Sequence, residues 1–341
     1  MFHTVSRTAK DGAMKKIKVN FVDFWPNFEN DNVFLPILRK YYDVEISDHP
    51  DYIFGSVLGD SYLDYDCVRI FYTGENLCPD YNLYDYSIDY EYMDYGDRHF
   101  RYPNYIMWNE AFSGMVKKHL VTEEEIRTKT GFCGFVYSNG KGNPARTQFF
   151  DLLSQYKRVD AGGQLRNNIG VPEGIKDKLA FQTEHKFAIA FENSSHPGYT
   201  TEKLIEAFAA KTVPIYWGDP LVGLGFDEEA FINCHRYASF EEVVEAVKQV
   251  DQDDALYRKM LLTPALKSRE YSQKETYKRL ERFLLNIFDQ PLEQAYRRNR
   301  ELWGKHYYET RLNQREYARI AGKVKKLVPH SLIEKLKNRK R

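Results

Sequence analysis

The sequence predicts an α/β protein with two successive domains and a basic helical tail. Two stretches of the 341-residue chain alternate short apolar runs with segments of helical spacing, the pattern of a parallel sheet flanked by helices. A polar stretch at 121–130 separates the two series. We therefore expect an N-terminal domain over 1–130, a second domain over 131–291 and a helical tail over 292–341, the first two of ordinary domain size.

The elements follow in order along each series. Apolar runs predict strands at 16–25, 42–47, 51–57 and 67–76, with a helix over 34–42. The second series has strands at 131–138, 157–163, 187–193 and 213–217, with helices at 144–156 and 200–211. Thr200 or Thr201 is expected to begin the last of these helices. Ligands of such folds bind at the carboxyl ends of the strands, so the cleft between the domains is the expected site.

Composition excludes several functional classes. Lys and Arg number 49, as do Asp and Glu, so a general nucleic-acid binder is disfavoured. The four cysteines show no paired spacing, which fits a reducing compartment and excludes a disulfide scaffold. Neither a signal peptide nor a run of about 18 apolar residues is present, so we expect a cytoplasmic protein that does not span a membrane. The motifs GxGxxG, GxxxxGK[ST] and HExxH are absent, which disfavours dehydrogenases, P-loop NTPases and zinc hydrolases.

The neutral total hides an asymmetry of charge. Residues 292–341 contain 15 Lys and Arg against 5 Asp and Glu, a net charge of +10. An acidic, tyrosine-rich stretch at 60–95 carries part of the opposite charge, and we expect it to form a separate surface with a separate role. The end of the tail, 324–341, places Leu, Val and Ile among Lys and Arg, as interfacial helices do. A solvated helix, an RNA-binding arm and an anchor on anionic lipid are the three interpretations, and we favour the anchor.

The densest group of polar residues follows the strand at 187–193. The sequence NSSHPGYTTEK leads from this strand into a helix, and such loops direct unpaired N–H groups and the positive helix end toward an anion. Glu202 and Lys203 fall in the first helical turn, where one accepts from hydroxyls and the other donates to phosphate. An ordinary helix start with a surface Glu–Lys pair fits the same residues.

Three blocks, in order, resemble the α-1,3/4-fucosyltransferases, most closely the bacterial members. They are TGEN and the tract after it (71–103), FVYSNGKGNPARTQFFDLL with VDAGGQLRNN (135–168), and FENS…GYTTEKLIEAF…VPIYWGDP (191–220). The similarity covers roughly residues 16–290. Ala161 stands where some relatives have a further glycine, and the tandem seven-residue repeats of some relatives are reduced to one irregular helix at 296–320.

The resemblance implies a fold and an activity. It implies two facing Rossmann-like domains of the GT-B type, with GDP-fucose bound by the C-terminal half and a glycan acceptor by the N-terminal half. It also implies inverting α-1,3 transfer of L-fucose to an N-acetylglucosamine of a lactosamine-type glycan, with no metal or other cofactor. The alternatives are an α-1,4 linkage, another nucleotide-sugar glycosyltransferase of this fold, or a catalytically silent glycan-binding protein. Because bacterial acceptors in the family are often lipid-linked, a peripheral location on the inner membrane is expected.

The resemblance also assigns roles to individual residues. Glu75 in TGEN matches the general base, with Asp80 and Asp85 as the next candidates. The donor-site positions are Ser138, Asn139, Arg146, Arg166, Asn193, Tyr199, Glu202 and Lys203. Among them Lys203 and Arg166 match the cations that neutralise the diphosphate, and Glu202 matches the ribose-binding acid.

Other residues leave alternatives open. Glu75 also fits a solvated turn, and Arg146 also fits a structural ion pair. Trp25 either stacks on an acceptor sugar or belongs to the core. The tyrosines of 81–95 form either a packed flap or an acceptor platform. His196 has no second ligand near it in the sequence, so no metal role is expected, and 216–217 are expected in the core.

Overall fold

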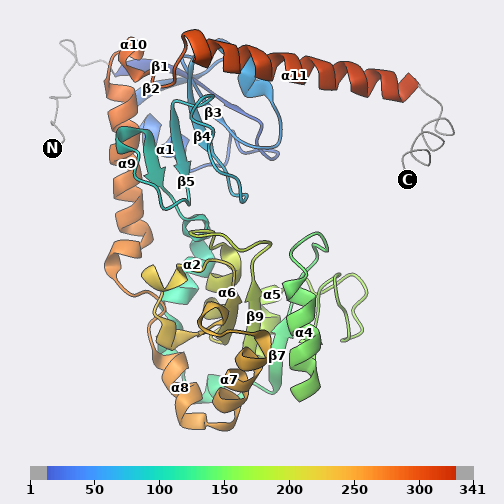
Figure 1. Ribbon diagram of the computed structural model, residues 1–341. Coiled ribbons are helices and arrows are strands. Elements are labelled where there is room, and N and C mark those ends of the chain that lie inside the picture. Colours follow the sequence, from blue (N-terminus) through green and yellow to red (C-terminus); the bar gives the residue numbers. More distant parts are fainter. Residues whose placement is uncertain (1–13, 328–341) are drawn as a thin grey trace. The chain divides into compact units, whose positions relative to one another are not determined.

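The computed structural model describes residues 14–327. Over these residues the chain forms two compact units, each built on its own parallel sheet (Figure 1). The first unit comprises the chain up to Ile88, the segment Gly96–Arg98 and the chain from Leu284 onward, and the second comprises Asp89–Tyr95 and His99–Phe283. No helix within residues 14–327 combines the length and the hydrophobicity needed to cross a bilayer.

The first unit contains a parallel sheet in the order β2-β1-β3-β4-β5. Its elements are β1 (Lys15–Val22), α1 (Phe34–Arg39), β2 (Tyr42–Ile46), β3 (Tyr52–Gly55), β4 (Val68–Tyr72), β5 (Tyr86–Asp89), α10 (Leu292–Ala295) and α11 (Leu302–Leu327). Every residue of β4 is buried, as expected for a strand covered on both faces of a parallel sheet. The strands predicted at 16–25, 42–47, 51–57 and 67–76 are all present, and each is shorter than predicted, β2 by only one residue.

The second unit contains a parallel sheet in the order β11-β10-β9-β7-β8. The strands of this sheet are β7 (Gly131–Phe135), β8 (Val159–Ala161), β9 (His185–Phe191), β10 (Val213–Trp217) and β11 (Ile232–Asn233), and a further strand, β6 (His99–Arg101), lies outside it. Its helices are α2 (Asn109–Val116), α3 (Glu123–Arg127), α4 (Ala145–Tyr156), α5 (Lys178–Thr183), α6 (Glu202–Ala209), α7 (Phe240–Gln252) and α8 (Asp254–Leu262). One further helix, α9 (Gln273–Asp289), begins in this unit and ends in the first.

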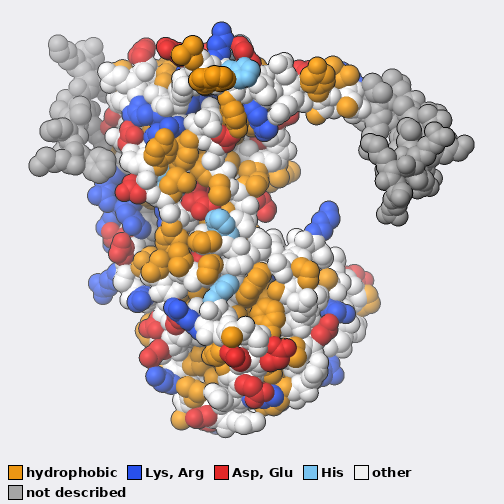
Figure 2. All heavy atoms as spheres, viewed as in Figure 1, with side chains coloured by type: hydrophobic (Ala, Val, Ile, Leu, Met, Phe, Trp, Pro, Cys, Tyr) orange, Lys and Arg blue, Asp and Glu red, His pale blue; other side chains and the backbone are white. Residues whose placement is uncertain are grey.

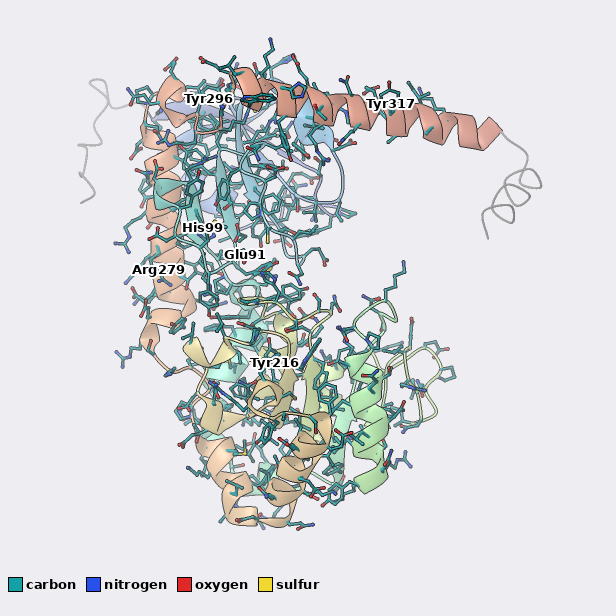
Figure 3. The ribbon with its side chains drawn as sticks, viewed as in Figure 1. Glu91, His99, Tyr216, Arg279, Tyr296 and Tyr317 are labelled. Atoms are coloured by element: carbon teal, nitrogen blue, oxygen red, sulfur yellow. The ribbon has the colours of Figure 1, made fainter. Side chains whose placement is uncertain are left out.

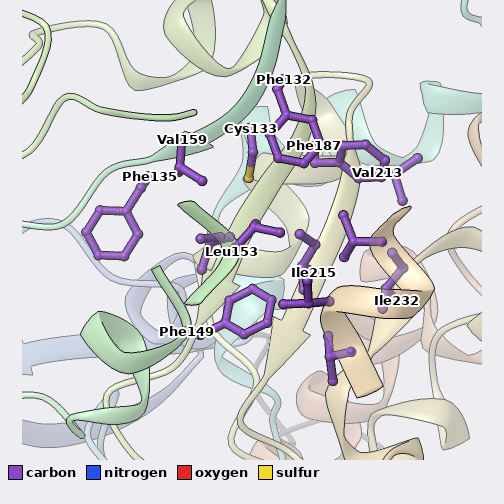
Figure 4. Close-up of a cluster of buried hydrophobic side chains, with 14 of the residues drawn as sticks. Phe132, Cys133, Phe135, Phe149, Leu153, Val159, Phe187, Val213, Ile215 and Ile232 are labelled. Atoms are coloured by element: carbon purple, nitrogen blue, oxygen red, sulfur yellow. The ribbon is translucent and has the colours of Figure 1, made fainter. Parts of the chain in front are cut away.

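The core of the second unit lies between its sheet and the helices α4 and α7. Phe149 and Leu153 of α4 meet Phe187 and Ile215 of the central strands in one buried cluster (Figure 4). All four side chains are at most 2% exposed. Burying such a cluster stabilises the unit by about 25 cal/mol for each Å² of apolar surface removed from water, and it fixes the positions of the strand ends.

The units divide the chain at different places from the expected boundaries. Residues 99–130 belong to the second unit, because α2 packs on α6 and the buried Lys118 donates to the carbonyls of Met260 and Leu261 at 2.8 and 3.0 Å. The chain from Leu284 returns to the first unit, where the ring of Phe288 lies 4.4 Å from that of Tyr52. Long-range packing of this kind has no signature in local composition.

The tail does not form a surface separate from the acidic stretch. Arg298 and Asp85 form a buried ion pair at 2.5 Å, and Arg315 of α11 pairs with Asp64 at 2.7 Å. Further pairs of this kind join Arg297 to Asp97, Arg300 to Asp66 and Arg319 to Asp60. The expected separation of the two surfaces is therefore wrong for these residues. The helix predicted at 296–320 is present from Leu302 onward as α11, but 296–301 are not helical. Residues 328–341 lie outside the described residues.

Candidate active site

A buried carboxylate organises the loop between β9 and α6. Glu192 follows the last residue of β9 and is fully buried, with a side-chain exposure of 0%. It accepts hydrogen bonds from the backbone N–H of Thr201 at 2.8 Å and from its hydroxyl at 2.7 Å. Thr201 is the residue before the helix, as predicted, but its hydroxyl serves Glu192 instead of capping α6. Both Thr200 and Thr201 were candidate caps in the sequence analysis, but Glu192, which binds Thr201, was not singled out there.

Lys203 stands between two carboxylates in the first turn of α6. Its Nζ lies 3.2 Å from Glu192 and 3.0 Å from Glu202, and it also donates to the hydroxyl of Thr201. Burial alone would lower the pKa of Lys203, but the two carboxylates raise it well above its usual range. Burial raises the pKa of Glu192, while at Glu202 the neighbouring ammonium outweighs burial and lowers it. The lysine is therefore held as a fixed, charged donor.

Arg146 is a second buried cation of this site. It belongs to α4, is 1% exposed, and its guanidinium lies 4.5 Å from the ring centre of Tyr137. It donates to the side chain of Asn193 and to the carbonyls of Phe191 and Asn139. No carboxylate pairs with it among the residues that the structure describes, so the structural ion pair considered from the sequence is not formed.

Tyr137 connects the two cations. Its hydroxyl donates to the carbonyl of Ile189 at 2.9 Å and accepts from the N–H of Phe191 at 2.6 Å, which fixes it against β9. Burial raises its pKa, and the charges of both Arg146 and Lys203 act in the opposite direction. The two cations are therefore close enough to the same phenol to act on its ionisation.

Two glycines allow the loops of the site to approach each other. Gly198 has a φ of +85°, and a Cβ there would lie 2.3 Å from the carbonyl oxygen of Tyr90. This approach brings the buried Tyr199 against Tyr90, with ring centres 5.2 Å apart. A Cβ on Gly163 would lie 2.2 Å from the carbonyl oxygen of Tyr137, so the Gly–Gly pair after β8 permits contact with the end of β7.

The loop after β10 is tied to the same cluster. Ser195 donates to the carbonyl of Gly218 at 2.7 Å, and Thr200 donates to the carboxylate of Asp219 at 3.2 Å. Tyr216, labelled in Figure 3, is fully buried, as predicted, and donates from its hydroxyl toward the carbonyl of Tyr199. The carboxyl ends of β7, β9 and β10 thus carry one connected group of polar residues, at the edge where parallel sheets bind ligands.

Two predicted donor residues stand apart from this group. Arg166 is exposed and pairs with Asp151 at 3.0 Å on the surface, beside Phe150. Ser138 is exposed as well. The structure brings Arg146, Asn139 and Asn193 into contact. Within residues 14–327, Arg166 forms no hydrogen bond or ion pair with any other predicted donor residue.

The first unit carries the predicted general base. Glu75 is exposed in the loop after β4, and its backbone N–H donates to the hydroxyl of Thr73 at 2.9 Å. Of the other acids considered, Asp85 is fully buried against Arg298. Trp25 is half-buried among aromatic rings, 4.8 Å from Phe28, which favours the core interpretation over stacking on a sugar.

Sequence reasoning missed Glu192 and Tyr137 as members of the site. A glutamate directly after a buried apolar strand was the available signal for Glu192, since an acid at that place must find partners. The ring Nε2 of His196, for which no metal role was expected, lies 2.8 Å from the carboxylate of Glu91 within the same unit. Tyr137 had no comparable signal.

Comparison with known proteins identifies the family. Residues 19–108 match the Alpha-(1,3)-fucosyltransferase FucT N-terminal domain, and residues 126–279 match Glycosyltransferase family 10 (fucosyltransferase) C-term. The chain belongs to this fucosyltransferase family. The family predicted from the three sequence blocks is therefore confirmed.

Individual fucosyltransferases agree with this assignment. The Alpha-(1,3)-fucosyltransferase FucT of Helicobacter pylori is 30% identical over 318 residues, which cover 80% of this chain and 66% of that protein. Human 3-galactosyl-N-acetylglucosaminide 4-alpha-L-fucosyltransferase FUT3 is 29% identical over 153 residues, 44% of this chain and 40% of that protein. The chain thus spans at most about two thirds of these curated fucosyltransferases.

Solved fucosyltransferase structures share the fold. An α1,3-fucosyltransferase has a TM-score of 0.72 and 26% identity, covering 88% of this chain and 96% of that one. A structure of α1,3-fucosyltransferase with GDP-fucose gives a TM-score of 0.69 at 26% identity, with 87% and 96% covered. The predicted α/β fold class of the GT-B type is confirmed.

Proposed function

We propose that this fucosyltransferase-family protein is an inverting α-1,3-fucosyltransferase that uses GDP-fucose. The observation that carries the proposal is a pair of cations at the carboxyl edge of the second sheet, the mostly buried Lys203 and the buried Arg146. A leaving diphosphate needs stabilised negative charge, and two fixed cations supply it where other enzymes use a metal ion. The similarity to an α1,3-fucosyltransferase solved with GDP-fucose supports the same donor.

Each donor residue then has a proposed role. Lys203 supplies a point charge to the diphosphate, and Arg146 supplies a planar group that its contact with Tyr137 holds in place. Glu202 accepts from the ribose hydroxyls, and Asn193 and Tyr199 contact the nucleotide sugar. Arg146 replaces Arg166 as the second diphosphate cation, because Arg166 is exposed and paired with Asp151. Asn139 contributes through Arg146, whereas Ser138 gains no support from its position.

Glu75 is proposed as the general base. Fucose is β-linked in GDP-fucose and α-linked in the product, so a single displacement inverts the anomeric carbon. The acceptor hydroxyl must lose its proton as it attacks, and a carboxylate within hydrogen-bond reach accepts it. Positive charge develops on the ring as the bond to the diphosphate breaks, and the proposed cations stabilise the departing oxygen.

The proposed acceptor is a lactosamine-type glycan attacked at its N-acetylglucosamine. The names of the relatives support this substrate class, since they include both 4-galactosyl-N-acetylglucosaminide 3-alpha-L-fucosyltransferases and 3-galactosyl-N-acetylglucosaminide 4-alpha-L-fucosyltransferases. The second name keeps the α-1,4 linkage as the alternative. A silent glycan-binding protein would have no use for the buried cations.

We also propose peripheral attachment to an anionic inner-membrane surface through 324–341. Five arginines of the tail pair with acids of the first unit, namely Arg297, Arg298, Arg300, Arg315 and Arg319. The sequence of 324–341 adds seven Lys and Arg against one Glu. Deleting 321–341 is expected to abolish sedimentation with anionic vesicles at low salt, and high salt is expected to have the same effect by screening. Full-length protein that never sediments with such vesicles would contradict the attachment.

One experiment tests the proposed reaction. The protein is incubated with GDP-fucose and separate type 1 and type 2 lactosamine disaccharides, with and without EDTA. We expect α-1,3 transfer to the Galβ1-4GlcNAc acceptor that persists in EDTA, because the two cations take the place of a metal. An absolute requirement for Mn²⁺ or Mg²⁺ would contradict the role of the cations, and transfer only to the Galβ1-3GlcNAc acceptor would establish the α-1,4 alternative.

A further inference from the structure

A cavity of about 440 Å³ opens at the start of α11 in the first unit. Its side chains come from Asn82, Asn299, Trp303, His306, Tyr307 and Thr310. Trp303 is 80% exposed, an unusual state for so large an apolar ring. Hydrophobic side chains are visible beside a histidine over the start of α11 (Figure 2). A ring exposed in this way beside a cavity indicates a binding surface.

The lining restricts the chemistry of the occupant. Three aromatic rings, two amides and a hydroxyl surround the cavity, and none of the lining residues is Lys or Arg although the tail around them is basic. An anionic headgroup or a nucleic acid would therefore meet no cation here. The lining also lacks Leu, Ile, Val and Met, which a lipid chain or an apolar helix would contact. A neutral molecule with one apolar face and many hydroxyls fits best.

The polar groups of the cavity are held in place by Asp80. Its carboxylate accepts from the hydroxyl of Tyr307 at 2.8 Å and from the side-chain amide of Asn82 at 3.1 Å. Within residues 14–327, the remaining amide oxygen of Asn82 and the indole N–H of Trp303 have no hydrogen-bond partner. The ring of His306 meets that of Trp303 at 82° with centres 5.9 Å apart, which restricts the indole on one side.

We propose that this cavity is a second carbohydrate site that binds one pyranose ring of a neutral oligosaccharide. The indole face of Trp303 packs against the apolar C–H face of the sugar. The indole N–H donates to a ring hydroxyl, and the amide of Asn82 and the hydroxyl of Tyr307 bind others. Of the three polar groups, Asp80 already holds two, those of Tyr307 and Asn82. Sugar binding therefore loses little side-chain entropy at these two residues.

The topology separates this site from the proposed general base. The strands β4 and β5 are parallel, so the connection between them runs from the carboxyl edge of the sheet back to its amino edge. Glu75 lies at the start of that connection and Asn82 near its end. If the proposed function holds, the ligand is a remote part of the acceptor, and a single disaccharide is too short to reach both places.

Direct binding is tested without any transfer reaction. A hexasaccharide of three lactosamine units is titrated into ¹⁵N-labelled protein without GDP-fucose, and the indole N–H signals of the four tryptophans are followed. We expect the signal that Trp303→Phe removes to shift on titration. No shift of that signal would overturn the inference, whether or not the protein transfers fucose. A shift in a protein that transfers no fucose would contradict the proposed function alone.

Kinetics test the role in the reaction. Trp303→Ala is expected to raise KM for the hexasaccharide by roughly tenfold, the upper range for one aromatic contact, with kcat and the disaccharide KM unchanged. Trp303→Phe keeps an aromatic ring, so its KM for the hexasaccharide should stay close to that of the wild type. Trp303→Leu lacks the ring, so its KM should rise as in Trp303→Ala. The matched control is Tyr317→Ala, since Tyr317 is 74% exposed on the same helix but outside the cavity (Figure 3).

Three results would overturn the inference. If Trp303→Ala lost the same share of its activity on the hexasaccharide and on the disaccharide, Trp303 would act on the transfer site or on folding. Full activity of Trp303→Leu on the hexasaccharide would indicate simple apolar packing. A change from dimer to monomer in light scattering on Trp303→Ala, with unchanged kinetics, would identify the surface as a contact between copies of the chain.

Discussion

The proposed donor cluster and the loop with the proposed base are built in opposite ways. In the second unit, Glu192 is fully buried and Lys203 is 12% exposed, and each contacts several other members of the cluster. In the first unit, Glu75 is exposed and its side chain has no hydrogen-bond or ion-pair partner within residues 14–327. The groups proposed to stabilise the leaving diphosphate are therefore fixed before the donor binds, whereas the proposed base depends on its loop and on the substrate for its orientation.

The largest expected effect concerns the loop. Glu75→Gln keeps the size of the side chain but removes its ability to accept a proton, so we expect kcat to fall by about 10²- to 10⁴-fold. The affinity for GDP, measured by calorimetry, should be unchanged, and so should the melting temperature, because the side chain is exposed. A variant that turns over within threefold of the wild type would exclude Glu75 as the base.

The second effect concerns the buried cluster. Lys203→Met removes a charge-assisted partner of the diphosphate, worth about 1.5–3 kcal/mol, so GDP should bind at least tenfold more weakly. The same change leaves Glu192 buried without its cation, and the melting temperature should fall.

The double variant Glu192→Gln/Lys203→Met separates these two consequences. Glutamine carries no charge, so the melting temperature should recover while GDP affinity stays low. Recovery of GDP affinity in the double variant would show that Lys203 acts on Glu192 and has no direct contact with the donor.

A third comparison uses two arginines of the second unit. Arg146→Ala should weaken GDP binding by roughly tenfold, the loss expected for one charge-assisted hydrogen bond, while Arg166→Ala should change it less than about twofold. The surface pair of Arg166 with Asp151 makes this variant a matched control. The opposite order would restore the assignment made from the sequence alone.

The smallest expected effect is a dependence of the stability of the second unit on pH. Burial lowers the pKa of Lys118 in the second unit to about 7, from an ordinary value of 10.5. The unfolded chain therefore binds more protons between these values, and the free energy of unfolding should rise with pH, by at most about 1.4 kcal/mol per pH unit. Hydrogen exchange from pH 7 to 9 should show this rise in the second unit, and Lys118→Met should reduce it. An unchanged slope in the variant would exclude Lys118 as the cause.

The sequence was sufficient for local features of both regions. The buried strand β4 and the buried part of β9 at 187–191 appear in the sequence as mainly apolar runs, and the placement of Glu202 and Lys203 in a first helical turn is confirmed. Spacing alone could not choose between Arg146 and Arg166. That choice depends on which side chain is buried against Tyr137, and burial is set by the packing of α4 on the sheet.

Contacts between distant parts of the chain were the main feature that the sequence did not predict. The acidic stretch and the basic tail were expected to serve separate roles, yet Asp85 and Arg298 form a buried pair across more than 200 residues. Opposite charge on two segments is compatible both with pairing and with separate partners. The compact units also divide the chain elsewhere than at residue 130, since the contacts of Lys118 with Met260 and Leu261 join residues far apart in the sequence.

The division of the chain has a consequence for how the protein is made. The second unit is inserted into the first, whose remaining part begins only at Leu284. On a ribosome, Asp85 emerges about 200 residues before its partner Arg298, a delay of roughly 10–40 s at ordinary rates of synthesis. During that interval the acid lacks the arginine that neutralises it, and the pocket for Phe288 beside Tyr52 stays open. The second unit can complete its fold in that time, so we expect nascent chains stalled before residue 284 to hold it folded and to depend on chaperones for the first.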